Sequence, residues 1–242
     1  YDFTHYLLMV DREPNENNPT LKRLIEAIKD MQKENEKGIK EASKKSAEET
    51  KKGIKRDYSD TSLSTSQIKE LLNNAKIPTS GRDAIIFGKN NLTPKIVEFM
   101  HKNNKKMIIE KASNKEVELL QNANFRHPED VRASLDHDAI AHILKRHGVN
   151  SVNVRNGEIP ITYEDIANYR SFIDVADDIF ADNNLIAFKQ INGYAVVVEQ
   201  AVNRKSELVL KTMFKSNGDY KNNNAYKKFS STGLNANAKV QP

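Results

Sequence analysis

Residues 185–214 read LIAFKQINGYAVVVEQAVNRKSELVLKTMF, and this stretch predicts three β-strands with short connections. Its apolar, β-branched runs cover residues 185–191, 194–202 and 207–214. Asn192-Gly193, between the first two runs, is a strong signal for a two-residue hairpin turn. Strands joined by links this short form an antiparallel meander.

Helix signals precede the meander. Residues 136–147 read DHDAIAHILKRH, with apolar residues at helical spacing, and Gly148 follows as a C-terminal cap. Thr162 and Asp165 have the spacing of a capping box that opens another helix. Helices followed by these strands predict an α+β domain in which the helices pack on a small antiparallel sheet.

The N-terminal half is expected to be mostly helical. Asn18-Pro19 predicts the start of a long, partly exposed helix, either a connector or a plain spacer. Helix starts at Ser64 and Thr93, with strands over 84–88 and 106–110, predict a small α/β element. We therefore expect three parts, with these bounds: 1–60, a helical arm or connector; 61–125, the small α/β element; and 126–242, the α+β domain.

Composition narrows the function classes. The 242 residues carry a net charge of +5 and include no cysteine, which excludes disulfides and cysteine-based zinc sites. No apolar run approaches the roughly 18 residues of a membrane span. Residues 183–242 hold nine Lys or Arg against three Asp or Glu. A basic element of this kind suits a polyanion, and a solvated lysine-rich face is the alternative.

Four of the six histidines fall between residues 127 and 147. On a helix, His137 and His147 share one stripe, whereas His142 points elsewhere, one turn from both Asp138 and Arg146. A contact with Asp138 would orient His142 for proton transfer near neutral pH. Any one of these histidines fits an ordinary surface or core position, but the cluster favours a function. Their spacing of five does not suit a helical zinc pair, so we expect no metal.

Polar residues interrupt two of the predicted strands. Glu199 stands in an apolar run, where an acid is costly unless it is paired, and Lys189 and Lys211 are its candidate partners. A structural ion pair and a catalytic carboxylate are both open. Strict alternation along 207–214 would place Thr212 with Leu208 and Leu210 on one face, and Lys211 on the other.

Aromatic and basic residues alternate after the meander. Tyr226 and Lys227 belong to this pattern, and the hydroxyl of Ser231 follows closely. Rings that stack on bases, beside cations that meet phosphates, suit a single-stranded nucleic acid. An ordinary edge strand with polar flanks is the alternative.

Four segments, taken in order, carry a family resemblance: HILKRHG (142–148), GEIPITYEDI (157–166), FKQINGYAVVVEQAV (188–202) and LVLKTMFK (208–215). Together they resemble the phage- and toxin-associated nuclease domains grouped with barnase, EndoU, the colicin nucleases and RelE. The resemblance covers about residues 126–232. It implies an α+β fold and RNA cleavage without a metal or other cofactor, by attack of a ribose 2′-hydroxyl on the adjacent phosphate.

The resemblance also implies a set of site residues. His142 and His147 match the helix histidines, with His142 as base or acid. Lys211 matches a charge stabiliser, and Thr212 a phosphate contact. Expected substrate-binding residues around them are His137, Arg146, Lys189, Glu199, Tyr226, Lys227 and Ser231. Because His142 points about 140° away from His147, the helix alone cannot complete the site, and the strands must supply the rest.

The implied biology is that of a ribonuclease toxin. Its partners would be RNA, such as tRNA or another cellular RNA, and a cognate immunity or antitoxin protein. It would act in the bacterial cytoplasm after delivery by a secretion system or a phage particle. Two alternatives stand beside it: a nucleic-acid-binding module without catalysis, and an interaction protein of a phage or secretion structure.

Overall fold

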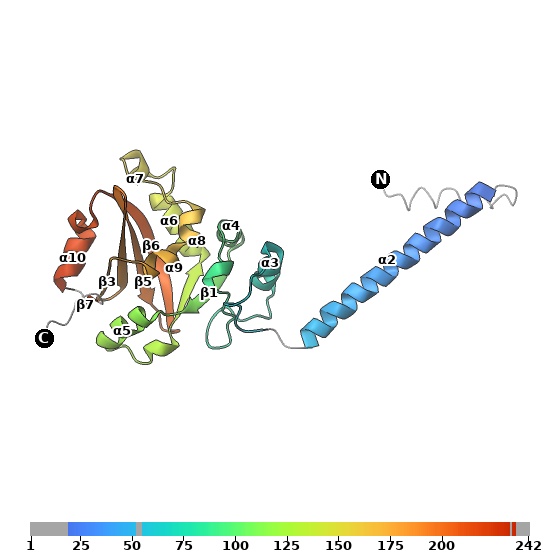
Figure 1. The fold of residues 1–242 in the computed structure, drawn as a ribbon, viewed down its shortest axis with the longest axis horizontal. Coiled ribbons are helices and arrows are strands. Elements are labelled where there is room, and N and C mark those ends of the chain that lie inside the picture. The colour runs from blue at the N-terminus through green and yellow to red at the C-terminus, as the bar shows by residue number, and fades with distance from the viewer. Residues whose placement is uncertain (1–18, 52–54, 233, 236–242) are drawn as a thin grey trace. The chain divides into compact units, whose positions relative to one another are not determined.

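The computed structural model describes residues 19–51, 55–232 and 234–235 (Figure 1). The chain divides into two compact units, one up to Ile54 and one from Lys55 onward. In the first unit the described part is one helix, α2 (Pro19–Lys51), where a long helix is predicted. None of the helices in the described ranges has the length and apolar character that crossing a membrane requires.

The second unit is an α+β fold, as the sequence predicts. Its described strands form one seven-stranded sheet in the order β1-β2-β6-β5-β4-β3-β7. The strand bounds are β1 (Lys106–Lys111), β2 (Arg132–Asp136), β3 (Asp178–Ala181), β4 (Leu185–Ile191), β5 (Tyr194–Val202), β6 (Glu207–Asn217) and β7 (Leu234–Asn235). The predicted meander is confirmed as β4-β5-β6, with Gly193 at a φ of 80° in the hairpin turn.

The sheet is larger than predicted, and it is mixed rather than wholly antiparallel. The sequence analysis did not predict β2, which lies between β1 and β6 and runs parallel to β6. Its sequence RASLD has no β-branched residue, so local propensity does not indicate a strand. Hydrogen bonding to β1 and β6, both distant in sequence, makes this segment a strand.

Two layers of side chains cover the two faces of the sheet. Helices α6, α8 and α9 cover one face, which we call the helical face (Figure 1). The other, the C-terminal face, is partly covered by α10. The helices and 3-10 turns of this unit are α3 (Thr65–Asn73), η1 (Lys89–Asn91), α4 (Pro94–Asn103), α5 (Asn114–Asn122), η2 (Pro128–Asp130), α6 (His137–His147), α7 (Val152–Arg155), α8 (Tyr163–Ala167), α9 (Tyr169–Asp174), η3 (Tyr220–Asn222) and α10 (Asn224–Thr232).

A β-bulge in β6 changes which of its residues lie on each face of the sheet. Glu199 pairs with Thr212 and Gln200 with Leu210, so Lys211 is an extra residue. Met213 therefore joins Leu208 and Leu210 in the core of the helical face. Phe214 packs on the C-terminal face instead. The strict alternation expected from sequence is wrong here, because the inserted residue shifts its phase.

The segments on either side of residue 126 share one sheet and one core. β1 pairs along its length with β2. The main core cluster joins Ile68, Ile96 and Met107 to Ile140 and Leu208. The boundary expected between 125 and 126 therefore does not coincide with the edge of a compact unit.

Candidate active site

Helix α6 carries the predicted histidines, and local sequence determines both of its ends. Asp136 Oδ1 accepts a hydrogen bond from the backbone N–H of Ala139 at 2.8 Å, which caps the N-terminus. Gly148 caps the C-terminus, as predicted, and a Cβ there would collide with the carbonyl oxygen of Leu144. The helix therefore ends at His147, next to the end of β6.

The imidazole of His147 is held in one orientation by its neighbours. It is 8% exposed, and its ring stacks on Phe214 at a centroid distance of 5.5 Å. Its Nδ1 lies 2.5 Å from Oε1 of Glu158. No partner for Nε2 is found in the part of the chain that the structure describes. A carboxylate on one ring nitrogen orients the ring and leaves the other nitrogen for proton exchange.

The segment after α6 brings Glu158 back to His147. The backbone N–H of Ile161 donates to the carbonyl oxygen of His147 at 2.7 Å. Ile159 forms an antiparallel bridge with Lys215, so residues 158–160 lie along the end of β6. Two backbone anchors thus flank Glu158 and hold its carboxylate against the imidazole.

An open pocket of about 360 Å³ lies beside this pair. Glu158 and Phe214, whose side chains contact His147, belong to its lining. Its other side chains are mostly neutral hydrogen-bonding groups: Asn153, Asn156, Ser216, Asn217 and Asn223, with one cation, Lys215. Lys215 Nζ lies 3.0 Å from Asp165. Amide N–H groups and one ammonium can bind phosphate oxygens next to an imidazole that moves a proton.

The other histidines of α6 lie apart from this pocket. His142 and Arg146 are exposed. His137 is half-buried, and its Nε2 lies 3.3 Å from Asp138. That carboxylate was expected to orient His142, but the contact that the structure gives it is with His137. Of the three predicted helix histidines, His147 alone lies next to the pocket.

The predicted strand residues are divided between different surroundings. Lys211 is exposed on the bulge, and Thr212 is half-buried opposite Glu199. Glu199 accepts a hydrogen bond from the amide of Asn184 at 2.6 Å. Lys189, one expected partner of Glu199, pairs with Asp177 instead, at 3.3 Å. Glu199 is therefore satisfied by a neutral amide rather than by a lysine.

The predicted C-terminal residues Tyr226, Lys227 and Ser231 all lie on α10. The ring of Tyr226 packs against Phe180, Phe188 and Tyr220, with centroid distances of 5.1–5.6 Å. Lys227 is exposed. The hydroxyl of Ser231 donates to the carbonyl oxygen of Lys228 within its own helix at 2.8 Å. The aromatic contacts of Tyr226 attach α10 to the C-terminal face, so this segment is a helix and not the edge strand considered as the alternative.

Sequence reasoning missed Glu158 and Lys215 as site residues. Both lie in the quoted motifs, but neither stands out by periodicity or by a cluster of its own. The capping box of Thr162 and Asp165, which the sequence predicts and the structure confirms, places Asp165 near Lys215. Only the pairing of residues 158–160 with the end of β6 brings Glu158 to His147.

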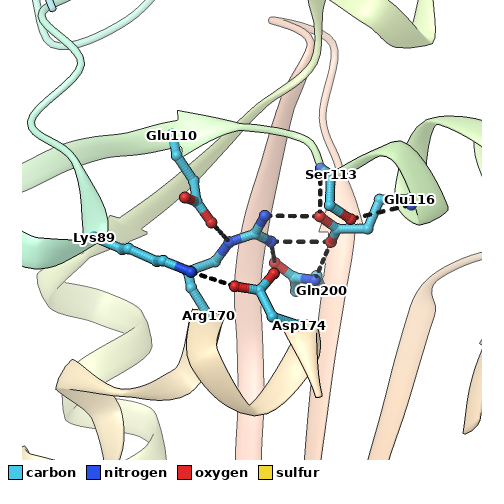
Figure 2. A network of polar contacts seen from close by, with 7 residues as sticks. All are labelled: Lys89, Glu110, Ser113, Glu116, Arg170, Asp174 and Gln200. Atoms are coloured by element: carbon cyan, nitrogen blue, oxygen red, sulfur yellow. Dashed lines mark hydrogen bonds and ion pairs between the residues drawn. The ribbon is translucent and has the colours of Figure 1, made fainter. Parts of the chain in front are cut away.

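A second polar cluster, centred on Arg170 of α9, was also missed (Figure 2). Arg170 is 1% exposed and makes two hydrogen bonds to Glu116, at 2.7 and 2.9 Å. It also donates to Glu110 at 2.8 Å and to Gln200 at 3.0 Å. The network joins α9, α5, β1 and β5 on the helical face, and its centre is closed to a substrate. We therefore assign it to stability.

Charge pairing inside this network shifts its titration. Burial is the largest influence on Glu116 and raises its pKa, but the charge and hydrogen bonds of Arg170, with those of Ser113 and Gln200, outweigh it. The pKa of Glu116 therefore lies below its ordinary value of 4.5. Burial lowers the pKa of Arg170, but Glu116 more than compensates and raises it, so both groups are charged at neutral pH.

Among the described residues, one group of side chains has the spacing for a shared metal ion. Its members are His127, Glu129 and Asp130, with ligand atoms within 4.8 Å of one another. All three are exposed, and such surface groups are common without an ion. The three predicted histidines of α6 do not form such a group.

Comparison with known proteins identifies one family. Residues 110–223 match the model of the family described as phage-Barnase-EndoU-ColicinE5/D-RelE like nuclease3. No curated protein and no solved structure gives a significant match. The matched range includes His147, Glu158 and the whole pocket beside them. The C-terminal part of this chain is thus similar to the phage-Barnase-EndoU-ColicinE5/D-RelE like nucleases, as its ordered motifs predict.

Proposed function

We propose that this protein is a metal-independent ribonuclease of the toxin type, with His147 at the centre of its active site. The observation that carries the proposal is the His147–Glu158 pair beside an amide-lined pocket. The family match supports the nuclease class, and the substrate, the mechanism and the toxin role are our proposals.

In the proposed reaction, His147 Nε2 takes the proton of a ribose 2′-hydroxyl. The 2′-oxygen then bonds to the adjacent phosphorus as the P–O5′ bond breaks, and the departing 5′-oxygen of the next nucleotide takes up a proton from water. The products are a 2′,3′-cyclic phosphate and a 5′-hydroxyl. Lys215, Asn217 and Asn223 would bind the phosphate oxygens, whose charge grows in the transition state. Glu158 acts as a positioning residue, because its carboxylate holds Nδ1 of the His147 imidazole.

Four of the other predicted residues would contact the RNA around the active site. Thr212 lies two residues before Phe214 on β6 and would contact the RNA near the pocket. Lys211, exposed on the bulge, would meet a phosphate further along the chain. His142 and Arg146 would help to bind RNA from the exposed side of α6.

The test is RNA cleavage by the purified full chain in excess EDTA. We expect cleavage of single-stranded RNA to 2′,3′-cyclic ends and no cleavage of DNA of the same sequence, which lacks the attacking hydroxyl. His147→Ala should reduce the rate by about 10²–10⁴-fold, the usual contribution of a general acid or base. His142→Ala is the matched control on the same helix, and we expect a far smaller loss.

Two outcomes would contradict the proposal: cleavage that requires a divalent metal, and cleavage that His147→Ala leaves unchanged. Because His147 is mostly buried, His147→Gln is made as well, and thermal unfolding checks that both variants fold. RNA binding without any cleavage would favour the alternative of a binding module. Growth arrest of a bacterial host by the wild-type chain, but not by His147→Ala, tests the toxin role.

A further inference from the structure

A second pocket lies at the opposite end of β6, where that strand begins beside β2 and β1. Its volume is about 440 Å³, within the range of roughly 300–1,000 Å³ typical of small-molecule sites. We call it the β1–β2–β6 pocket. The residues of its lining that matter here are Arg82, Lys111, Arg132, Arg204, Lys205 and Glu207.

Glu207 gives this pocket a buried acceptor. It is 2% exposed, and no partner for its Oε1 is found among the described residues. Lys106, on β1, forms an ion pair with Oε2 of Glu207. Its ammonium also donates a hydrogen bond to the hydroxyl of Ser80 at 2.7 Å. A buried carboxylate oxygen without a partner is costly, so a ligand that donates a hydrogen bond to Oε1 would be favoured.

Around this acceptor the lining is basic. Lys111, Arg204 and Lys205 are exposed, and Arg132 is half-buried. Two acids, Glu129 and Asp130, also belong to the lining, and Asp130 lies 3.8 Å from Arg82. Five cations against three carboxylates leave the pocket positively charged, with its buried negative group at Glu207.

This charge arrangement selects the class of ligand. A bare phosphate is disfavoured next to the carboxylate of Glu207, and a metal cation is disfavoured among the arginines and lysines. A nucleotide satisfies both requirements, because its phosphates are anionic and its base presents N–H donors. Carboxylates accept such hydrogen bonds from base amino groups, and Arg and Lys bind phosphates.

The position of the pocket on β6 connects it to the proposed active site. Glu207 and Val209 alternate with the core residues Leu208 and Leu210, so they face away from the helical face. After the bulge, Phe214 faces the same way. Phe214 lies seven positions after Glu207 on β6, a span of at most about 23 Å at roughly 3.3 Å per residue. A strand of a few nucleotides can span this distance.

We propose that the β1–β2–β6 pocket binds a nucleotide of a single-stranded RNA substrate away from the bond to be cut. Arg204, Lys205 and Lys111 would bind its phosphates, and Glu207 would accept hydrogen bonds from its base. This inference rests on the proposed function for the identity of the substrate, but its binding test does not depend on cleavage.

The experiment measures binding of labelled 2′-O-methyl RNA octamers to the full chain by fluorescence anisotropy. These octamers cannot be cut by 2′-hydroxyl attack. The double variant Arg204→Ala/Lys205→Ala should weaken binding about tenfold and reduce its salt dependence, because two phosphate contacts are lost. The matched control, Lys76→Ala/Lys95→Ala, removes two exposed lysines after α3 and on α4, and its Kd should stay within about twofold.

Glu207→Gln tests the buried acceptor. We expect it to change the order of affinity among A, C and U octamers, because these bases differ in their N–H donors. Thermal unfolding checks that this variant folds, and the exposed double variant keeps the proposal testable if it does not. An unchanged order of affinity in a folded Glu207→Gln protein would overturn the role of Glu207.

Three further outcomes separate the two proposals. If RNA is cleaved but Arg204→Ala/Lys205→Ala binds the octamers like the control variant, the pocket is not an RNA site. If nothing is cleaved and the double variant still loses binding, the pocket proposal holds and the ribonuclease proposal fails. An acidic octapeptide that displaces the octamer at a lower concentration than unlabelled RNA would assign the pocket to a protein partner and overturn the inference.

Discussion

His147 owes its proposed role to three neighbours: Glu158 on one ring nitrogen, Phe214 under the ring and the pocket beside them. His142, five residues earlier on the same helix, has none of these contacts and is exposed. An imidazole in a fixed orientation loses less entropy on reaching the transition state than a free one. The same residue type on one helix can therefore have quite different chemistry.

Glu158 can be tested as a positioning residue. Glu158→Gln should lower kcat by about tenfold or more with little change in KM, because the ring of His147 loses its charged partner while the RNA contacts remain. Glu158→Asp should recover part of the rate, since it keeps the carboxylate. Steady-state cleavage kinetics measure both variants. A loss confined to KM would contradict the positioning role.

Glu116 gives a prediction about stability and pH. Glu116→Gln breaks its buried ion pair with Arg170 and should lower the free energy of unfolding by about 3–5 kcal/mol at neutral pH. Because the pKa of Glu116 is lowered by folding, this stabilisation is present above its unfolded value of 4.5 and is lost as the pH falls through the lower folded value.

The difference between wild type and Glu116→Gln should therefore shrink as the solution is made acidic. Urea unfolding at a series of pH values measures this difference. Glu118→Gln, an exposed position on the same helix, is the control and should change stability by less than about 0.5 kcal/mol. A difference that is independent of pH would show that the pair does not act through its charge.

At the scale of elements, α10 closes part of the C-terminal face through its aromatic residues. The rings of Phe188, Tyr220 and Tyr226 contact one another and belong to three separate elements, β4, η3 and α10. Stacked and edge-to-face ring contacts of this kind add to the free energy gained from burial. The aromatic spacing that suggested base stacking thus serves to dock a helix on the sheet.

Tyr226→Ala should consequently destabilise the protein. We expect a loss of about 2 kcal/mol in the free energy of unfolding, because a half-buried ring leaves its aromatic neighbours. Lys227→Ala, at the exposed neighbouring position, should leave stability unchanged within about 0.5 kcal/mol. Denaturant unfolding compares the two. If Tyr226→Ala weakens RNA binding without altering stability, the ring stacks on a base instead.

For the whole molecule, the unit from Lys55 onward depends on both sides of residue 126. Segment 61–125 contributes β1 and a large share of the main core, including Ile68, Ile96 and Met107. Without it, β2 would lose one of its two neighbours and the core would lose buried apolar surface. Small domains have little free energy to spare for such a loss.

Truncation tests this dependence. A fragment of residues 55–242 should fold cooperatively and cleave RNA at the rate of the full chain. A fragment of residues 126–242 should not fold, because it lacks β1 and the helices α3, α4 and α5. Circular dichroism melting curves and the cleavage assay measure both fragments. A folded, active 126–242 fragment would instead support an independent domain beginning at 126.

The sequence by itself determined the features that local patterns encode. The β4-β5 hairpin at Gly193, the limits of α6 and the capping boxes at Ser64 and Thr162 all follow from residues a few positions apart. The α+β class followed from the order of these elements, and the nuclease resemblance from the ordered motifs.

Only the tertiary structure decided how distant segments meet. The parallel insertion of β2, the bulge at Lys211, the partner of His147 and the network around Arg170 each join residues that local spacing does not relate. Periodicity reports which face of an element is apolar, and not which element covers it. The candidate site therefore needed the fold, because its imidazole and its carboxylate belong to segments that the end of β6 brings together.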